Sequence, residues 1–298
     1  MRLTLLHFND LHGRLEQLPR LFQLARRERA AAVAAGRQVL LLDGGDSSDP
    51  GRRECDLTQG RANFSLLEAM GVQATVVGNA EGLSWGRPAL AKMVAAVDFP
   101  VLAANLVDAA DPADPARPAV PGLKGGVLLD LAGFPLGLIG LTQTFPEAFE
   151  RAGYAVVDPR AVLRHEIDGL REQGARLILL LSHLGLDAGS QAVQSWDAAN
   201  PLYDRAVAEG FPEIAVIVGG HTHSVLQKPV RVGRTIIVQA GDFGRYLGRL
   251  DLEVDDATGA VTDFSGRLIP CGADVPPDPT IQGTLEFVIE EAGRLKKL

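Results

Sequence analysis

The sequence is poor in cysteine and has no surplus of positive charge. Of 298 residues only Cys55 and Cys271 are cysteines. Two thiols so far apart fit neither a disulfide framework nor a zinc-ribbon spacing, so we expect both to be free. The formal net charge of −8 argues against a broad electrostatic grip on nucleic acid, and we expect no nucleic-acid polymer as a partner.

Long apolar runs and a leader segment are also missing. No run reaches the length of a membrane span, and "MRLTLLHFND" passes directly into a strand-like pattern, without a basic start and a small-residue cleavage site. We therefore expect no membrane partner, and a cytoplasmic location. The hydrophobic content of 46% is enough for one large core or two smaller ones.

What the sequence does contain is an alternation of short apolar runs with helical stretches. "LTLLHF", a helical stretch over 15–36 and "QVLLLDGGD" predict a βαβ unit, and therefore an α/β fold. The runs in "RLILLLSHLG" and "IAVIVGGHTH" are unbroken, as expected of strands covered on both faces. Beyond residue 225, closely spaced short strands predict an antiparallel second sheet packed on the first, and a last helix is predicted at about 279–297.

Polar side chains of ligand type recur where the apolar strands end. In open α/β sheets the carboxyl ends of the strands converge on one crevice, so residues far apart in the sequence meet there. Carboxylate, imidazole and amide groups without thiolate suit Mn²⁺, Fe²⁺, Zn²⁺ or Co²⁺. The residues with this placement are Asp10, His12, Asp46, Asn79, His183, His221 and His223.

Five motifs carry a family resemblance. "NDLHG", "GGDSSDPG", "GNAEG", "LSHLG" and "GGHTH" occur in this order, and together they resemble the calcineurin-like metallophosphoesterases, most closely the 5′-nucleotidase branch. The resemblance covers nearly the whole chain and implies a four-layer αββα sandwich of two mixed sheets, with two divalent metal ions, Mn²⁺ first among them, at the strand ends. The ligands that it implies are Asp10, His12 and His223 for one metal, Asn79, His183 and His221 for the other, and Asp46 as a bridge. Asn105 matches an asparagine that contacts substrate phosphate in the nucleotidases.

One motif departs from the family pattern. Where nucleotidases have "GNHEFDYG" or similar, this chain has "GNAEGLSWG", one residue longer between the outer glycines. The resemblance implies that the missing histidine stabilises the transition state and protonates the leaving oxygen, and Ala80 does neither. General acid help contributes on the order of 10²–10⁴ in rate. We hypothesise that Glu81 supplies part of it, beside Asp46 and Asn79 as the other catalytic residues.

Several neighbouring residues are not expected to be ligands. His7 lies inside the first strand and is expected in the core or beside the site, and His165 in a helix is expected to be solvated. Asp242 is expected in a turn and Trp85 to pack the altered loop against the fold. For Asp43 two roles stay open, orientation of a ligand and the end of its strand.

These observations give a ranked set of functions. First is a dinuclear metal-dependent phosphoesterase, of reduced activity, that hydrolyses small phosphomonoesters, phosphodiesters or nucleotides. The alternative is a catalytically weak metal-binding protein that recognises a phosphorylated ligand or partner, and a third hypothesis makes the chain one half of a split nucleotidase. We expect residues 1–298 to form a single domain without the C-terminal domain that supplies the nucleoside pocket of nucleotidases, so nucleotide specificity has no support in the sequence.

Overall fold

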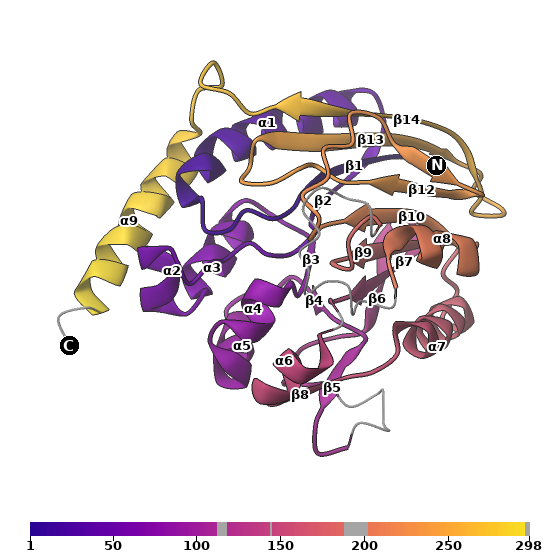
Figure 1. Ribbon diagram of the computed structural model, residues 1–298. Helices are drawn as coiled ribbons and strands as arrows, with labels where there is room; N and C mark the ends of the chain where they lie inside the picture. The colour runs from indigo at the N-terminus through magenta and orange to yellow at the C-terminus, as the bar shows by residue number, and fades with distance from the viewer. Residues whose placement is uncertain (112–117, 144, 188–201, 296–298) are drawn as a thin grey trace.

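The computed structural model describes residues 1–111, 118–143, 145–187 and 202–295. Within them two six-stranded sheets lie face to face (Figure 1). In the first sheet the first four strands of the chain are parallel, and two antiparallel strands extend the sheet beyond β1. In the order of pairing, its strands are β14 (Val261–Pro270), β13 (Tyr246–Val254), β1 (Arg2–Phe8), β2 (Gln38–Asp43), β3 (Ala74–Val76) and β4 (Val101–Leu102).

The second sheet is also mixed. Its four central strands are parallel, and an antiparallel strand closes each edge. In the order of pairing they are β11 (Val230–Val232), β12 (Thr235–Val238), β10 (Ile214–Gly219), β9 (Leu177–Ser182), β7 (Phe134–Leu141) and β6 (Gly126–Leu131). A small additional ribbon pairs β5 (Leu106–Asp108) with β8 (Tyr154–Val156).

Helices cover the outer face of each sheet (Figure 1). The second sheet is covered by α7 (Pro159–Glu172) and α8 (Asp204–Gly210). On the side of the first sheet lie α1 (Leu18–Ala34), α3 (Arg61–Ala69), α5 (Gly86–Val94) and α9 (Pro279–Leu295). Short helical segments complete the described chain, namely η1 (Leu15–Gln17), α2 (Arg53–Thr58), α4 (Asn79–Leu83) and α6 (Pro146–Arg151).

Three apolar clusters fill the spaces between these four layers. Strand β9 contributes to two of them, because alternate side chains of a strand point to opposite faces. Leu179 belongs to the cluster between the sheets together with Leu40 of β2, and Ile178 belongs to the outer cluster together with Leu163 of α7. The run is apolar throughout because both its faces are covered. The predicted four-layer αββα sandwich of two mixed sheets is confirmed.

The predicted arrangement of the strands beyond residue 225 is wrong. They do not form one separate sheet but divide between the two large ones: β12 pairs in parallel with β10, whereas β13 pairs antiparallel with β1. All four residues of β12 are buried, so the strand needs neighbours and cover on both sides. The alternation of side chains predicts which faces of a strand are buried, but not beside which strand it lies.

Two smaller expectations are also tested. The last helix ends at Leu295, within the predicted range, and Cys55 and Cys271 are free and buried, as predicted. None of the helices formed by the described residues has the length and apolarity needed to cross a bilayer.

Candidate metal centre

The predicted ligands lie on loops that follow the carboxyl ends of strands from both sheets. Asp10 follows β1, Asp46 follows β2 and His183 follows β9. The loops bind one another through their backbones: the N–H of Asp10 donates to the carbonyl of Gly45 (2.8 Å), and the N–H of His12 donates to the carbonyl of Asp46 (2.9 Å). The site is therefore built by contact between loops as well as by the sheets.

The backbone of these loops is unusual. Eight non-glycine residues of the described chain have a positive φ, and five of them are predicted ligands. This conformation is rare for residues with a side chain and costs on the order of 1–3 kcal/mol each, so it persists only where the surrounding structure enforces it, as at functional sites. The five, with φ between 45° and 69°, are Asp10, His12, Asp46, His221 and His223.

Asp10, His12 and His223 form one group of potential ligands, with donor atoms within 4.8 Å of one another. Oδ1 of Asp10 lies 3.4 Å from Nε2 of His223 and 3.7 Å from Nε2 of His12. The two Nε2 atoms are 3.1 Å apart. The ring of Phe243 packs edge-on against both imidazoles, with centroids 5.7 and 5.8 Å away. This group has the membership that the family resemblance implied for the first metal.

Asp10, Asp46 and His183 form a second, fully buried group. Nε2 of His183 lies 3.3 Å from Oδ2 of Asp46 and 3.9 Å from Oδ1 of Asp10. Oδ2 of Asp46 is also 3.7 Å from Nε2 of His12. Asp46 thus lies between the two groups, as a bridging ligand would, and Asp10 borders both.

Asn79 and His221 complete the cluster. Oδ1 of Asn79, the first residue of α4, lies 3.0 Å from Nδ1 of His221. The ring of His221 packs edge-on against that of His183, with centroids 5.4 Å apart, and its backbone N–H donates to Oδ2 of Asp10 (2.9 Å). The structure therefore brings all seven predicted ligands together.

Two of the imidazole rings are held in place by a contact of Nδ1, the ring nitrogen that points away from the ligand cluster. Nδ1 of His183 lies 2.7 Å from the carbonyl oxygen of Gly44, and Nδ1 of His223 lies 3.1 Å from Oδ2 of Asp242. An Nδ1–H that donates to these oxygens leaves Nε2 as the acceptor that points into the cluster. Metal-binding histidines are commonly oriented in this way.

Carboxylates and imidazoles of the centre stabilise each other's charged forms. Burial alone would raise the pKa of Asp10 and Asp46, but the neighbouring histidines hold the pKa of both carboxyls below its usual range. Burial would lower the pKa of His183, yet the Asp46 and Asp10 carboxylates raise it to about 10. The site thus stabilises positive charge beside its imidazole nitrogens, and a bound divalent cation supplies such charge in place of protons.

The residues present fit a divalent cation. Nε2 of His183 is buried and has no hydrogen-bond partner among the described residues, although it lies beside two carboxylates. Imidazole nitrogen and carboxylate or amide oxygen, without sulfur, are the donors of borderline-to-hard ions. The chemistry of the donor set therefore agrees with the metal class predicted from the sequence.

Comparison with known proteins gives the family. The model of the calcineurin-like phosphoesterase family matches residues 3–225, which include all seven ligand candidates. The chain belongs to the calcineurin-like phosphoesterase family. It is 29% identical to an uncharacterized metallophosphoesterase, YunD, of Bacillus subtilis over 85% of the chain and 50% of that protein. It is 28% identical to a 5′-nucleotidase of Diplobatis ommata over 94% of the chain and 50% of that protein.

A solved structure supports the fold. The sulfate thiohydrolase SoxB of Thermus thermophilus superposes with a TM-score of 0.78 at 24% identity, over 97% of this chain and 60% of that one. At this identity the likeness shows the fold alone. The chain spans about half the length of the curated relatives given above.

Glu81 lies in the motif that departs from the pattern implied by the family resemblance, and both of its carboxylate oxygens accept hydrogen bonds. Its Oε1 accepts from the N–H and the hydroxyl of Ser48 (2.8 and 2.7 Å). Its Oε2 accepts from the N–H groups of Asp46 and Gly78 (both 3.1 Å). Burial, helped by the Asp46 charge, raises the pKa of Glu81 to about 7. Both oxygens thus join the loop after β2 to the loop after β3, and this is the geometry of a positioning residue.

Asn105 is buried and bonds to the backbone of Thr142. Its Nδ2 donates to the carbonyl of Thr142, and its Oδ1 accepts from the N–H of the same residue (both 2.9 Å). Within the described chain no polar contact joins Asn105 to the ligand cluster. Its contact with substrate phosphate therefore stays a prediction.

The residues not expected to be ligands lie as follows. His7 is buried in β1, where burial lowers its pKa to about 4, and His165 is exposed on α7, as predicted. Trp85 packs against the apolar core and donates to Asp56 (3.1 Å), which confirms the packing role. Asp43 ends β2 and accepts from two hydroxyl groups (2.7 and 2.6 Å).

Sequence reasoning missed two residues that hold the ligands. Asn9 donates to Oδ2 of Asp10 (2.6 Å) and to the carbonyl of Gly241 (2.6 Å), so it fixes the Asp10 carboxylate. Asp242 begins a turn, as predicted, but it also contacts His223. Asn9 could have been found from its place in the motif "NDLHG". Asp242 is preceded by a glycine, which indicates a turn but not a contact with His223, so this contact becomes visible only in the fold.

Proposed function

We propose that the chain is a dinuclear metal-dependent phosphoesterase that hydrolyses small phosphomonoesters, phosphodiesters or nucleotides without a histidine at position 80. The observation that supports it most directly is the convergence of seven ligand-type side chains from both sheets, five of them on residues with a positive φ. We propose Mn²⁺ as the metal, with Fe²⁺, Zn²⁺ or Co²⁺ as alternatives. Asp10, His12 and His223 would hold one ion.

The remaining ligands would hold the second ion and orient the substrate. His183, His221 and Asn79 lie on that side of Asp46, which would touch both ions. When bound, two such ions supply charge neutralisation for the phosphoryl group and a lowered pKa for a coordinated water. The protein itself fixes the imidazoles through Gly44 and Asp242.

The altered motif determines which substrates would react fastest. Ala80 offers only its backbone N–H, which donates to Oδ1 of Asp46 (2.7 Å), so it orients a ligand but provides no side-chain proton. Substrates with good leaving groups, such as aryl esters and anhydrides, need no such proton and should be favoured. We retain Glu81 as a proposed contributor through the position of Asp46.

Glu81→Gln separates proton donation from positioning. A proton donor would be needed most by alkyl phosphates, so loss of a donor should slow these substrates far more than aryl phosphates. Loss of a positioning residue should slow the hydrolysis of alkyl and aryl phosphates to the same extent and lower the free energy of unfolding. Full turnover on alkyl phosphates in Glu81→Gln would remove Glu81 from the catalytic residues.

One observation favours a second candidate, a metal-binding protein that recognises a phosphorylated ligand or partner with little turnover. Position 80 is an alanine where the family resemblance implies a histidine, and the carboxylate of Glu81 accepts four hydrogen bonds from the protein. Such a protein would bind metals and phosphate esters but would not release phosphate.

Hydrolysis assays distinguish the two candidates. Chelator-stripped protein, reconstituted with Mn²⁺, is assayed with p-nitrophenyl phosphate and with bis-p-nitrophenyl phosphate, beside an Asp46→Asn control. Metal-dependent turnover that the control lacks supports the phosphoesterase, and the ratio of the two rates gives the preference for monoesters or diesters. Two bound Mn²⁺ ions without turnover on either substrate would support the binding protein.

Two wider proposals accompany this function. We propose that residues 1–298 act as a single domain, because the apolar clusters on the two faces of each sheet unite all four layers. We also propose the cytoplasm as the compartment, because free thiols persist in reducing surroundings. Measurement of the redox state of both thiols in cells would test the second proposal.

A further inference from the structure

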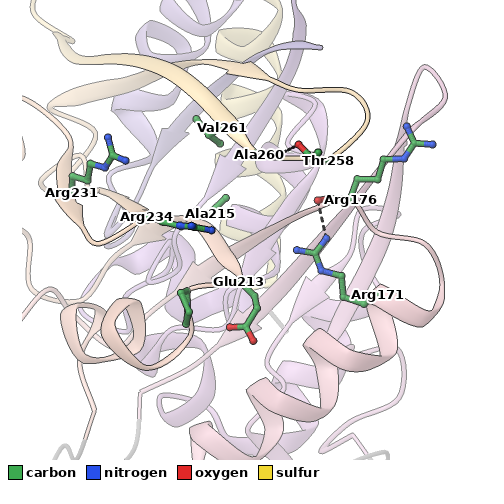
Figure 2. A pocket seen from close by; sticks show the side chains of 11 residues that line it. Arg171, Arg176, Glu213, Ala215, Arg231, Arg234, Thr258, Ala260 and Val261 are labelled. Atoms are coloured by element: carbon green, nitrogen blue, oxygen red, sulfur yellow. Dashed lines mark hydrogen bonds between the residues drawn. The ribbon is translucent and has the colours of Figure 1, made fainter.

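A pocket lies at the opposite ends of the strands from the ligand cluster. Its volume is about 690 Å³, within the range of small-molecule sites. Its walls are the end of α7, the start of β10, the turn between β11 and β12 and the hairpin turn between β13 and β14 (Figure 2). We call it the basic pocket. Its charged lining residues are Arg171, Arg176, Arg231, Arg234 and Glu213.

Three guanidinium groups of the basic pocket lack a contact with a carboxylate of the described residues, although the charge of Arg171 acts on Glu213 at longer range. Within the described part of the chain, Arg171, Arg231 and Arg234 form no ion pair with an acidic side chain. The one acid of the lining, Glu213, pairs with Arg164 outside the pocket (2.8 Å), which lowers the pKa of Glu213 through that hydrogen bond. The pocket is therefore a local excess of positive charge on a chain of net charge −8.

The arginines are partly ordered in advance. Arg171 donates from one nitrogen to the carbonyls of Ala175 and Arg176 (both 2.8 Å), and Arg231 donates from Nε to the carbonyl of Gly233 (3.1 Å). A guanidinium has five N–H donors, so most of them stay available to a ligand. Figure 2 shows Arg171 and Arg234 on facing sides of the pocket.

The frame of the basic pocket is tightly packed. A Cβ placed on Gly259, in the β13–β14 turn, would lie 1.8 Å from the carbonyl oxygen of Arg176. The turn therefore lies directly against the chain that leads into β9, and its φ of 73° is one that glycine adopts without strain. This contact joins a hairpin of the first sheet to the second sheet and fixes the distance across the pocket.

We propose that the basic pocket binds a small anion with two or more phosphate groups, such as pyrophosphate or a nucleoside diphosphate, separately from the metal centre. Planar guanidinium groups bind phosphate oxygens in pairs, and donors on facing walls suit an anion that carries charge at both ends. A small occupant fits because the pocket has a volume of about 690 Å³ and the molecule has a negative net charge, which repels a long polyanion.

The test is a calorimetric titration of metal-free protein with inorganic pyrophosphate. Without metals the ligand cluster has no divalent cation to hold the probe, and the arginine variants show whether binding occurs at the basic pocket. We expect saturable binding of one pyrophosphate, weakened at least about tenfold in Arg231→Gln/Arg234→Gln, because charged hydrogen bonds are lost. Arg151→Gln/Arg294→Gln removes two exposed arginines far from the pocket and should leave binding unchanged.

Three results would overturn the proposal. They are the absence of saturable binding, equal affinity in the two double variants, and tighter binding of duplex DNA than of pyrophosphate under the same salt conditions. Arg171→Gln provides a second line of evidence from the facing wall and should weaken binding independently. Thermal unfolding of each variant without pyrophosphate checks that its fold is retained.

Discussion

The two ends of the parallel strands differ in construction. At their carboxyl ends, seven ligand-type side chains converge, five of them on residues with a strained backbone, and Asp10, Asp46 and His183 are buried. At the amino ends of β9 and β10, exposed arginines line an open pocket without backbone strain at any of the four. Six-residue strands separate the two by about 20 Å. Metal binding requires ligand atoms held at fixed short distances from one another. Binding of an anion requires mainly that positive charge lies nearby.

The source of positive charge also separates the two ends. Without cations the carboxylates of the ligand cluster are paired with imidazoles and offer phosphate no metal ion, whereas the basic pocket has arginines that attract it. Bound divalent ions would add positive charge at the first end and leave the second unchanged. Phosphate binding at the two ends should therefore respond differently to metal removal.

The largest effect is expected from Asp46→Asn. This carboxylate lies between both groups of ligands, so its loss should remove several kcal/mol of electrostatic stabilisation and slow hydrolysis of p-nitrophenyl phosphate roughly 10³-fold. Pyrophosphate binding by the metal-free variant should not change. A variant that lost both properties together would contradict the separation of the two ends.

A gain of activity is expected from Ala80→His. The new imidazole would supply the proton donor that the family resemblance implies for this position, and we expect roughly 10²-fold faster hydrolysis of alkyl phosphates with a smaller gain on p-nitrophenyl phosphate. The difference between the two substrates is the decisive measurement. Ala80→Gln, a polar side chain without the acid, is the matched control, and equal gains in both variants would refute a role in proton donation.

The same comparison explains what the sequence predicted. The ligands were predictable because they follow strand ends within short motifs, and the layers were predictable because apolar runs such as that of β9 need cover on both faces. The pairing of β12 with β10 was not predictable, because it depends on contacts between segments far apart in the sequence. The basic pocket carries no motif either: Arg171 and Arg234 meet only because α7 and the β11–β12 turn fold to one place.

A moderate effect is expected from Asp242→Asn. Asp242 holds Nδ1 of His223 (3.1 Å), and loss of such a partner commonly weakens metal binding 10–100-fold. Calorimetric titration with Mn²⁺ measures the change. Arg245→Gln removes the other partner of Asp242 and should leave Mn²⁺ affinity within about threefold. If the two variants lost the same affinity, the turn as a whole, and not the contact with His223, would position the ligand.

The smallest effect is expected from His7→Leu, a change in β1 that involves neither the ligand cluster nor the basic pocket. Burial lowers the pKa of His7 to about 4, below its ordinary 6.5, so the folded protein keeps this ring neutral while the unfolded chain takes up a proton. The stability due to the neutral ring is complete above about pH 6.5 and is lost as the pH falls toward 4, by about 2 kcal/mol between pH 7 and 5. His7→Leu should flatten the dependence of the unfolding free energy on pH by this amount in metal-free protein. The exposed His165, changed to Gln, should not alter the slope, and an unchanged slope in His7→Leu would place the source of acid sensitivity in the ligand cluster instead.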